Sequence, residues 1–157
     1  MTTTTFRAAL SALASLNVAG VHASFDVDAL PAVLDRGQLP ALLALLVEPQ
    51  TRSLFREGGE GLQLPTFRGG ASSAVYSFTH LLLIAPRMSG GGARVHFPAL
   101  VTIIDAYMTA LGSDPLLGGA LEEMARVRVE PGYFVYGGLE YSGCAFRHEW
   151  RLRLGAA

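Results

Sequence analysis

The segment from Cys144 to Leu154 alternates in residue type from one position to the next, and this alternation constrains the fold more than any other feature. Mainly apolar residues occupy one set of positions, namely Cys144, Phe146, His148, Trp150, Leu152 and Leu154. Charged residues lie between them, namely Arg147, Glu149, Arg151 and Arg153. Because successive side chains of a β-strand point to opposite faces, the pattern predicts a strand with one buried face and one solvated face.

Two further runs of strand-like sequence precede this segment. Val127 and Val129 alternate with charged neighbours, and the run from Phe134 to Tyr141 is interrupted by Gly137-Gly138. A Gly-Gly pair supplies the positive φ angles that a two-residue hairpin turn requires. We therefore predict that Asp114 to Leu154 forms a short helical turn followed by a three-stranded antiparallel meander.

Two segments have apolar residues at the spacing of an amphipathic helix. The first follows Thr2 to Thr5, which are suitable N-caps, and ends near Asn17 or Gly20. The second has Pro98 in its first turn and ends at Gly112. The predicted buried stripes are Phe6, Ala9, Leu10, Leu13 and Ala14 in the first helix, and Phe97, Leu100, Val101, Ile104, Met108 and Leu111 in the second.

The remaining apolar runs are interpreted as strands, with one ambiguous stretch. Val21 to Phe25 is a short candidate, and Ala74 to Ala85 is a strong one whose two faces both become apolar toward its end. Leu39 to Pro49 is rich in Leu and Ala, which favours a helix, but its short length between prolines favours a buried strand. Asp28 to Gly37 is compatible with a helical turn through Pro31 to Leu34.

The order of these elements predicts a single α+β domain over residues 1–157. We expect a mostly antiparallel sheet with a C-terminal meander, and two main helices packed on one face of it. Gln50 to Ser73 is rich in Gly, Arg and Glu, and it is predicted to be a long loop or a mobile hairpin. We expect this segment to become ordered only when the protein assembles with a partner.

The composition favours contacts with other proteins. Half of the 157 residues are hydrophobic and 16% are charged, so much of the surface consists of small neutral residues or is covered by a partner. The formal net charge of -1 argues against nucleic-acid binding driven by overall charge. The sequence shows neither a signal peptide nor an uninterrupted apolar stretch long enough to cross a membrane, so we expect a soluble protein in the cytoplasm when it is made.

The sequence contains no motif typical of catalysis, metal binding or nucleotide binding. The four histidines lack the spacing of metal ligands, and the single cysteine, Cys144, cannot form an internal disulfide or a zinc site. His80 and His148 lie on apolar strand faces, where a buried histidine with a hydrogen-bond partner is expected. Gly90-Gly91-Gly92 lies between a strand and a helix but lacks the rest of a phosphate loop. We therefore predict a protein that is not an enzyme and uses no cofactor or metal.

Charged residues that face solvent are the candidate functional residues. The charged face of the last strand is either a plain solvated surface or a contact surface. All twelve basic residues are arginine, which is typical of a GC-rich genome and also suits interfaces because its planar fork pairs bidentately with carboxylates. The candidate contacts to a partner or a neighbouring subunit are Arg147, Glu149, Arg151, Arg153, Arg87, Arg94, Arg52, Arg56 and Arg68.

Three C-terminal segments carry a resemblance to a known family. They are the helix end Ile104-Asp105-Ala106-Tyr107, the turn Asp114-Pro115-Leu116-Leu117-Gly118-Gly119, and the hairpin Tyr136-Gly137-Gly138-Leu139-Glu140-Tyr141-Ser142-Gly143. In this order, and followed by an alternating strand, they resemble the tail terminator (tail completion) proteins of long-tailed bacteriophages and related gene-transfer particles. The N-terminal helix and the proline-bounded apolar run are similar in placement.

The resemblance implies a small α+β protein without catalytic activity that forms a ring, commonly a hexamer. Such a ring caps the head-proximal end of the tail tube, stops its polymerisation and contacts the head-closure protein, while DNA passes through the lumen without specific binding. The implied location is the virion, after assembly in the host cytoplasm. Two alternatives remain: another connector of the neck, such as a head-closure or adaptor protein, and a small-molecule binding domain with a pocket lined by Tyr76, Phe78, Tyr107 and Trp150.

Overall fold

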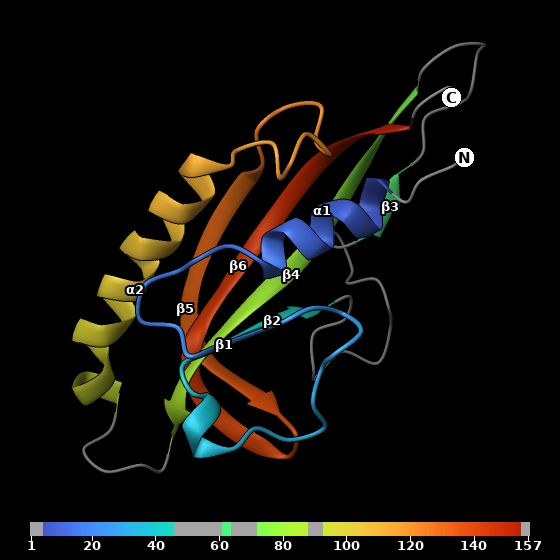
Figure 1. Cartoon of the computed structure of the whole chain (residues 1–157). Helices are drawn as coiled ribbons and strands as arrows, with labels where there is room; N and C mark the ends of the chain where they lie inside the picture. The colour runs from blue at the N-terminus through green and yellow to red at the C-terminus, as the bar shows by residue number, and fades with distance from the viewer. Residues whose placement is uncertain (1–4, 46–60, 64–71, 88–92, 155–157) are drawn as a thin grey trace.

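The structure is a computed structural model that describes residues 5–45, 61–63, 72–87 and 93–154. Within these residues, the chain is a mixed α+β protein with one mostly antiparallel sheet and two α-helices, which confirms the predicted fold class (Figure 1). The helices are α1 (Thr5–Ala14), α2 (Ala93–Ser113) and a short 3-10 helix, η1 (Arg36–Gln38). The strands are β1 (Ala23–Phe25), β2 (Ala41–Leu45), β3 (Gly61–Gln63), β4 (Ser72–Pro86), β5 (Arg126–Tyr136) and β6 (Leu139–Leu154).

The two longest strands, β4 and β6, form the centre of the sheet. The strand order is β1-β2-β4-β6-β5, and β3 pairs with β4 beside this path. β1 runs parallel to β2, whereas the other described pairs are antiparallel. The β4–β6 ladder extends from Ser72↔Leu154 to Pro86↔Tyr141, with one bulge between Leu83 and Ala85.

The C-terminal region has two long strands where we predicted a three-stranded meander. β5 and β6 pair continuously from Arg126↔Glu149 to Tyr136↔Leu139. The ladder runs through Pro131-Gly132, since a proline is tolerated in a strand at the edge of a sheet. The predicted turn at Gly137-Gly138 is confirmed, with φ angles of 58° and 83°.

One face of the sheet carries the larger hydrophobic cluster, to which both helices contribute. α1 supplies Ala9, Leu10 and Leu13, as its stripe predicted, and it lies across β4 and β6 (Figure 1), while α2 contacts β4 and β6. The sheet residues of the cluster occupy every second position of their strands, because alternate side chains of a strand point to the same face. They include Tyr76, Phe78 and Leu82 of β4 and Cys144, Phe146, Trp150 and Leu152 of β6.

The opposite face is apolar only at one end. There, the segment that follows β1 contributes Leu34 and Leu39 to a second cluster, together with Leu81 and Leu83 of β4. This confirms that both faces of β4 are covered toward its end. The predicted helical turn through Pro31 to Leu34 is wrong: η1 begins later, and this stretch leads Leu34 onto the sheet without forming a helix.

The short strand β2 confirms the strand interpretation over the helix for its part of the Leu39 to Pro49 run. Leu42 packs in the helix-side cluster, whereas Ala41 and Leu43 pack in the second one. A strand buried on both faces needs no polar residue, which explains its near-continuous apolar sequence. Residues 46–49 and the cap candidates Thr2 to Thr4 lie outside the described residues, as does most of Gln50 to Ser73. The described parts of that segment are β3 and the first residues of β4.

The buried stripe of α2 differs from the predicted one. Its buried residues are Leu100, Ile103, Tyr107, Ala110 and Leu111, so the helix is rotated by about one residue relative to our expectation. Phe97, Val101 and Met108, which we predicted to be buried, are exposed. The reason is that α2 is apolar on more than one side, so that periodicity alone does not identify the side that faces the sheet.

Candidate functional site

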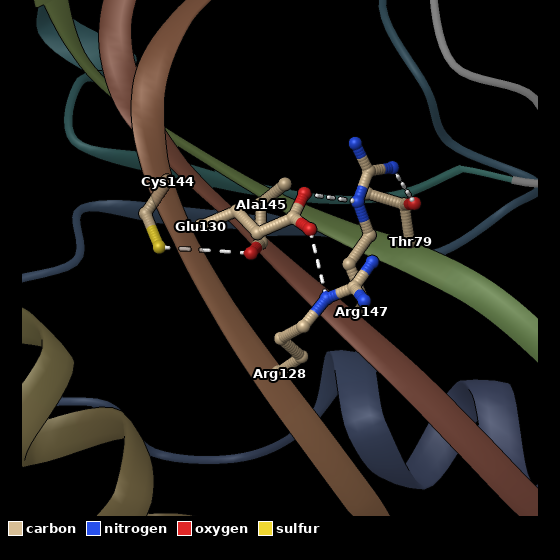
Figure 2. Close-up of polar contacts among 6 residues, drawn as sticks. All are labelled: Thr79, Arg128, Glu130, Cys144, Ala145 and Arg147. Carbon is tan, nitrogen blue, oxygen red and sulfur yellow. Dashed lines mark hydrogen bonds and ion pairs between the residues drawn. The ribbon is translucent and has the colours of Figure 1, made fainter. Parts of the chain in front are cut away.

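The outer, charged face of the sheet is centred on Arg147 (Figure 2). Arg147 Nε donates to Glu130 Oε2 at 2.9 Å, and its terminal nitrogen lies 2.5 Å from Thr79 Oγ1. The other carboxylate oxygen of Glu130 pairs with Arg128 Nε at 2.8 Å. Three neighbouring strands supply these groups, and the Arg147 side chain is only 11% exposed. Arg147 is therefore held within its own chain.

Other candidate contact residues also pair within the chain. Arg151 Nε lies 3.4 Å from Glu123 Oε1, and Arg87 lies 2.5 Å from Glu140 Oε1. The Arg87 guanidinium also lies 4.4 Å from the centre of the Tyr133 ring. Its hydrogen bond to Glu140 is the main cause that raises the pKa of Arg87. Exposed ion pairs of this kind contribute little to stability, because water and salt screen the charges.

The structure does not bring the predicted contact residues together into one site. Glu140 and Arg151 lie toward opposite ends of β6, roughly 35 Å apart at about 3.3 Å per residue. Glu149 is exposed between Arg147 and Arg151, and Arg94 is exposed at the start of α2. The side chain of Arg153, and all of Arg52, Arg56 and Arg68, lie outside the part of the chain that the structure describes.

A chain of hydrogen bonds runs through the interface between α2 and the sheet. Trp150 Nε1 donates to His148 Nδ1 at 3.0 Å, and His148 Nε2 lies 2.6 Å from the hydroxyl of Tyr107. The same hydroxyl lies 2.8 Å from His80 Nδ1. His80 is 0% exposed and His148 is 2% exposed. This confirms that the two histidines are buried and hydrogen-bonded.

Burial controls the ionisation of this hydrogen-bonded chain. It lowers the pKa of His80 from 6.5 to about 3. Burial, reinforced by the nearby His80, lowers the pKa of His148 well below its ordinary value, and burial raises that of Tyr107 well above its own. All three groups are therefore neutral near pH 7, because a charge in this apolar environment would lose its hydration.

The buried histidines make stability dependent on pH. A histidine with a lowered pKa in the folded state stabilises the fold above its unfolded pKa of 6.5, and that contribution is lost as the pH falls toward 3. Between pH 7 and pH 5, His80 alone should reduce the free energy of unfolding by about 2 kcal/mol, and His148 acts in the same direction. Urea titrations at the two pH values measure this difference. Equal stability at pH 7 and pH 5 would contradict the prediction.

Among the described residues, neither the buried side chains nor a set of metal ligands identifies a reaction centre. The aromatic residues proposed to line a pocket pack on one another instead, with ring centres of Phe78 and Trp150 at 4.4 Å and those of Tyr76 and Phe78 at 5.8 Å. Burial raises the pKa of Cys144 to about 12, so that its thiol stays protonated. The described residues contain no group of three or more His, Cys, Asp or Glu side chains that could hold a metal ion.

The exposed side of α2 carries large apolar residues that we had predicted to be buried. Phe97, Val101 and Met108 follow one line along the helix, and Val101 is 60% exposed. The residues Arg94–Ser113 are long and apolar enough to cross a membrane by length and composition, a property that core helices of soluble proteins share. The apolar residues that we assigned to the buried stripe were the available signal for this surface.

The sequence also left the role of Tyr107 unassigned. We named Tyr107 only as a possible pocket residue, because nothing in a sequence indicates that the hydroxyl of a helix residue lies between two histidines of the sheet. A tyrosine in helical register with Leu100, Ile103 and Leu111 was the available signal.

In comparisons with known proteins, no protein-family model matches the chain, and no curated protein matches its sequence.

Proposed function

We propose that the chain is a structural subunit of a bacteriophage neck or tail that forms a ring, with six subunits as the expected number. The ring caps the tail tube, ends its polymerisation and joins the tail to the head-closure protein. It performs no catalysis, and DNA passes through its lumen without specific binding. The protein is then located in the virion, after assembly in the host cytoplasm. The resemblance of the C-terminal segments suggests this function, and the exposed apolar stripe of α2 is the observation that carries it.

The apolar stripe consists of Phe97, Val101 and Met108, with the half-buried Ile104 between them. A continuous exposed stripe of large apolar side chains on a helix is typical of a surface that another protein covers. Within α2, the residues with formal charges are Arg94 and Asp105, so little desolvation of charge opposes such a contact. The stripe therefore suits a contact between subunits.

The free edge of the sheet is a second candidate contact surface. β5 pairs with β6 on one side, and the described residues provide no partner for its other side (Figure 1). A subunit of a cyclic ring uses two different surfaces, one toward each neighbour, because head-to-tail contacts close by rotation. In our proposal, the α2 stripe belongs to one of these two surfaces. The charged residues around Arg147, which pair with one another within the chain, belong to a face that is not required for ring closure.

The mechanism of such a ring is geometric. One axial face matches the last ring of the tail tube and ends its growth, because the opposite face does not reproduce the surface that the next tube ring would need. This accounts for a chain that requires no reaction centre. It also agrees with an interface candidate that is apolar, in a chain whose net charge is only -1.

A mass measurement on the purified protein tests the proposal directly. Native mass spectrometry should show a closed oligomer, either alone or on addition of tail-tube protein, and electron microscopy should show the ring at the end of the tube. A ring at another axial position would identify the chain as a different neck connector. A protein that stays monomeric and does not join tubes at any concentration would contradict the proposal.

Introducing a charge into the stripe should prevent assembly without unfolding the subunit. Val101→Glu places a carboxylate in the apolar contact, and we expect the oligomer to dissociate into monomers because an unpaired charge would be buried. Val101 is exposed in the single chain, so the thermal midpoint of the monomer should change little. Thr109→Glu, at an exposed position on the same helix outside the stripe, is the matched control and should leave the oligomer intact. An unchanged mass for Val101→Glu would exclude the stripe from the interface.

A further inference from the structure

The buried hydrogen-bonded chain has a direction that Trp150 determines. An indole N–H only donates, so His148 Nδ1 must accept, and the hydrogen of neutral His148 is then on Nε2. This N–H donates to the Tyr107 oxygen, and the Tyr107 hydroxyl donates in turn to His80 Nδ1. The last hydrogen is on His80 Nε2, which is buried and has no hydrogen-bond partner among the described residues. The arrangement is complete only when both imidazoles are neutral.

The elements around this chain offer nothing to stabilise a positive charge. The buried titratable groups on this side of the sheet are Tyr76 and His80 of β4, Cys144 and His148 of β6, and Tyr107 of α2. α1, β2 and β5 contribute apolar side chains there, such as Leu13, Leu42 and Val129. No carboxylate is among the buried residues that the structure describes. A proton gained by either histidine therefore has no counter-charge.

A proton on His80 would also reverse the hydrogen bond that holds α2. It would occupy Nδ1, so Tyr107 would accept from both histidines, and its own hydroxyl hydrogen would lose its acceptor. A proton on His148 would occupy Nδ1 and oppose the Trp150 N–H. In both cases, the bonds that fail either join Tyr107 of α2 to the sheet or involve His148, to which Tyr107 is hydrogen-bonded. The extensive backbone ladders between β4, β6 and β5 are unaffected.

We propose that the His80–Tyr107–His148–Trp150 chain is an acid-sensitive joint, through which protonation of the buried histidines releases α2 from the sheet while the β4–β6–β5 core stays folded. This proposal depends only on contacts within one subunit, so it is independent of the ring proposed above. The strongly lowered pKa values of both histidines agree with it, because their protonation requires the joint to open. In a ring, release of α2 would also remove the apolar stripe from the subunit contact.

Hydrogen exchange on the whole wild-type chain tests the proposal. Below the unfolded histidine pKa of 6.5, after correction for intrinsic rates, the opening constant of α2 amides should rise by about tenfold per pH unit of acidification for each histidine that gains a proton. With both histidines involved, the rise approaches about a hundredfold per pH unit, and at pH 5 the α2 amides should exchange through an opening that leaves the amides of β4 and β6 protected. Equal protection of α2 and the strands at pH 5, or no loss of protection in α2, would overturn the proposal.

A histidine variant tests how many protons are taken up when α2 is released. The slope of the opening constant against pH gives this number, whatever the overall stability of the variant. His80→Gln keeps an acceptor for Tyr107 but cannot be protonated, so the pH dependence of α2 opening should fall by about tenfold per pH unit. A purely structural effect would change the opening constant but not its slope. His22→Gln, at an exposed position, is the matched control and should leave the slope unchanged. The same slope in His80→Gln and wild type would refute the proposal.

A measurement on the wild-type protein keeps the test valid if the variant does not fold. Nitrogen NMR of the imidazoles should show both buried rings as the Nε2–H tautomer at pH 7, with His22 as the reference in the same chain. The fluorescence of Trp150, the single tryptophan, should then change together with α2 exchange as the pH falls. A buried imidazole in the Nδ1–H form, or fluorescence that is constant through α2 release, would overturn the assignment.

Discussion

Gly143→Ala should destabilise the fold by more than about 3 kcal/mol, because overpacking against backbone has no inexpensive relaxation. A Cβ at this position would overlap the carbonyl oxygen of Leu82 and lie 3.0 Å from the carbonyl carbon of the same residue. It would also lie 3.2 Å from the Cα of Leu83, next to the bulge in β4. These are backbone atoms of the central strand pair, so the two strands must separate to admit a methyl group.

The residue directly opposite in the ladder provides a matched control. Gly132 pairs with Gly143, and a Cβ on it would meet only ring atoms of Phe134 at 3.8 Å, which is an ordinary contact. Gly132→Ala should therefore leave stability unchanged or raise it by about 0.5 kcal/mol, since alanine restricts the unfolded chain. Chemical denaturation of both variants measures the difference. If the two variants unfold at the same denaturant concentration, the close approach of β4 and β6 at Gly143 is wrong.

Tyr107→Phe is expected to cost about 3 kcal/mol, although it removes only one oxygen atom. The hydroxyl accepts from His148 Nε2 and donates to His80 Nδ1, so its removal leaves two buried polar atoms without partners. Each such atom costs about 1–3 kcal/mol. The phenyl ring keeps its stacking on Phe146, with ring centres 3.7 Å apart, so packing should be preserved.

Tyr133→Phe is the control for this substitution. Tyr133 is 40% exposed, and a phenylalanine can retain the contact of its ring with Arg87, so the expected loss is below about 0.5 kcal/mol. Thermal and urea unfolding at pH 7 would compare the two variants. A Tyr107→Phe variant as stable as the control would show that the hydroxyl does not link the two histidines.

Local patterns predicted the elements whose side chains alternate or repeat without ambiguity. The strand from Cys144 onward, the turn at Gly137-Gly138 and the stripe of α1 agree with the structure because each depends on neighbouring residues only. The three-stranded meander was wrong because β5 continues through Pro131-Gly132, which are turn-forming residues in most contexts. Whether such a pair ends a strand depends on the partner strand, and here Gly143 and Cys144 lie opposite and continue the ladder.

The candidate contact residues were predicted less well than the fold. Charge alternation placed Arg147 on the outer face, where Figure 2 shows it, but the sequence could not indicate that Glu130 and Thr79 would hold it. A salt bridge between strands depends on register, and register is set by the whole ladder. The exposed stripe on α2 was hidden for a related reason, since an apolar helix has more than one side that could face the sheet.

The sequence by itself determined the α+β class, the polarity of the two faces of β6 and the burial of His80 and His148. These follow from backbone geometry and from the hydrophobic effect acting on residues one or two positions apart. Only the tertiary structure decided which side of α2 is buried and that Tyr107 joins the two histidines. Those properties arise where segments far apart in the chain meet, and the free energy of such contacts depends on the shape and polarity of both partners.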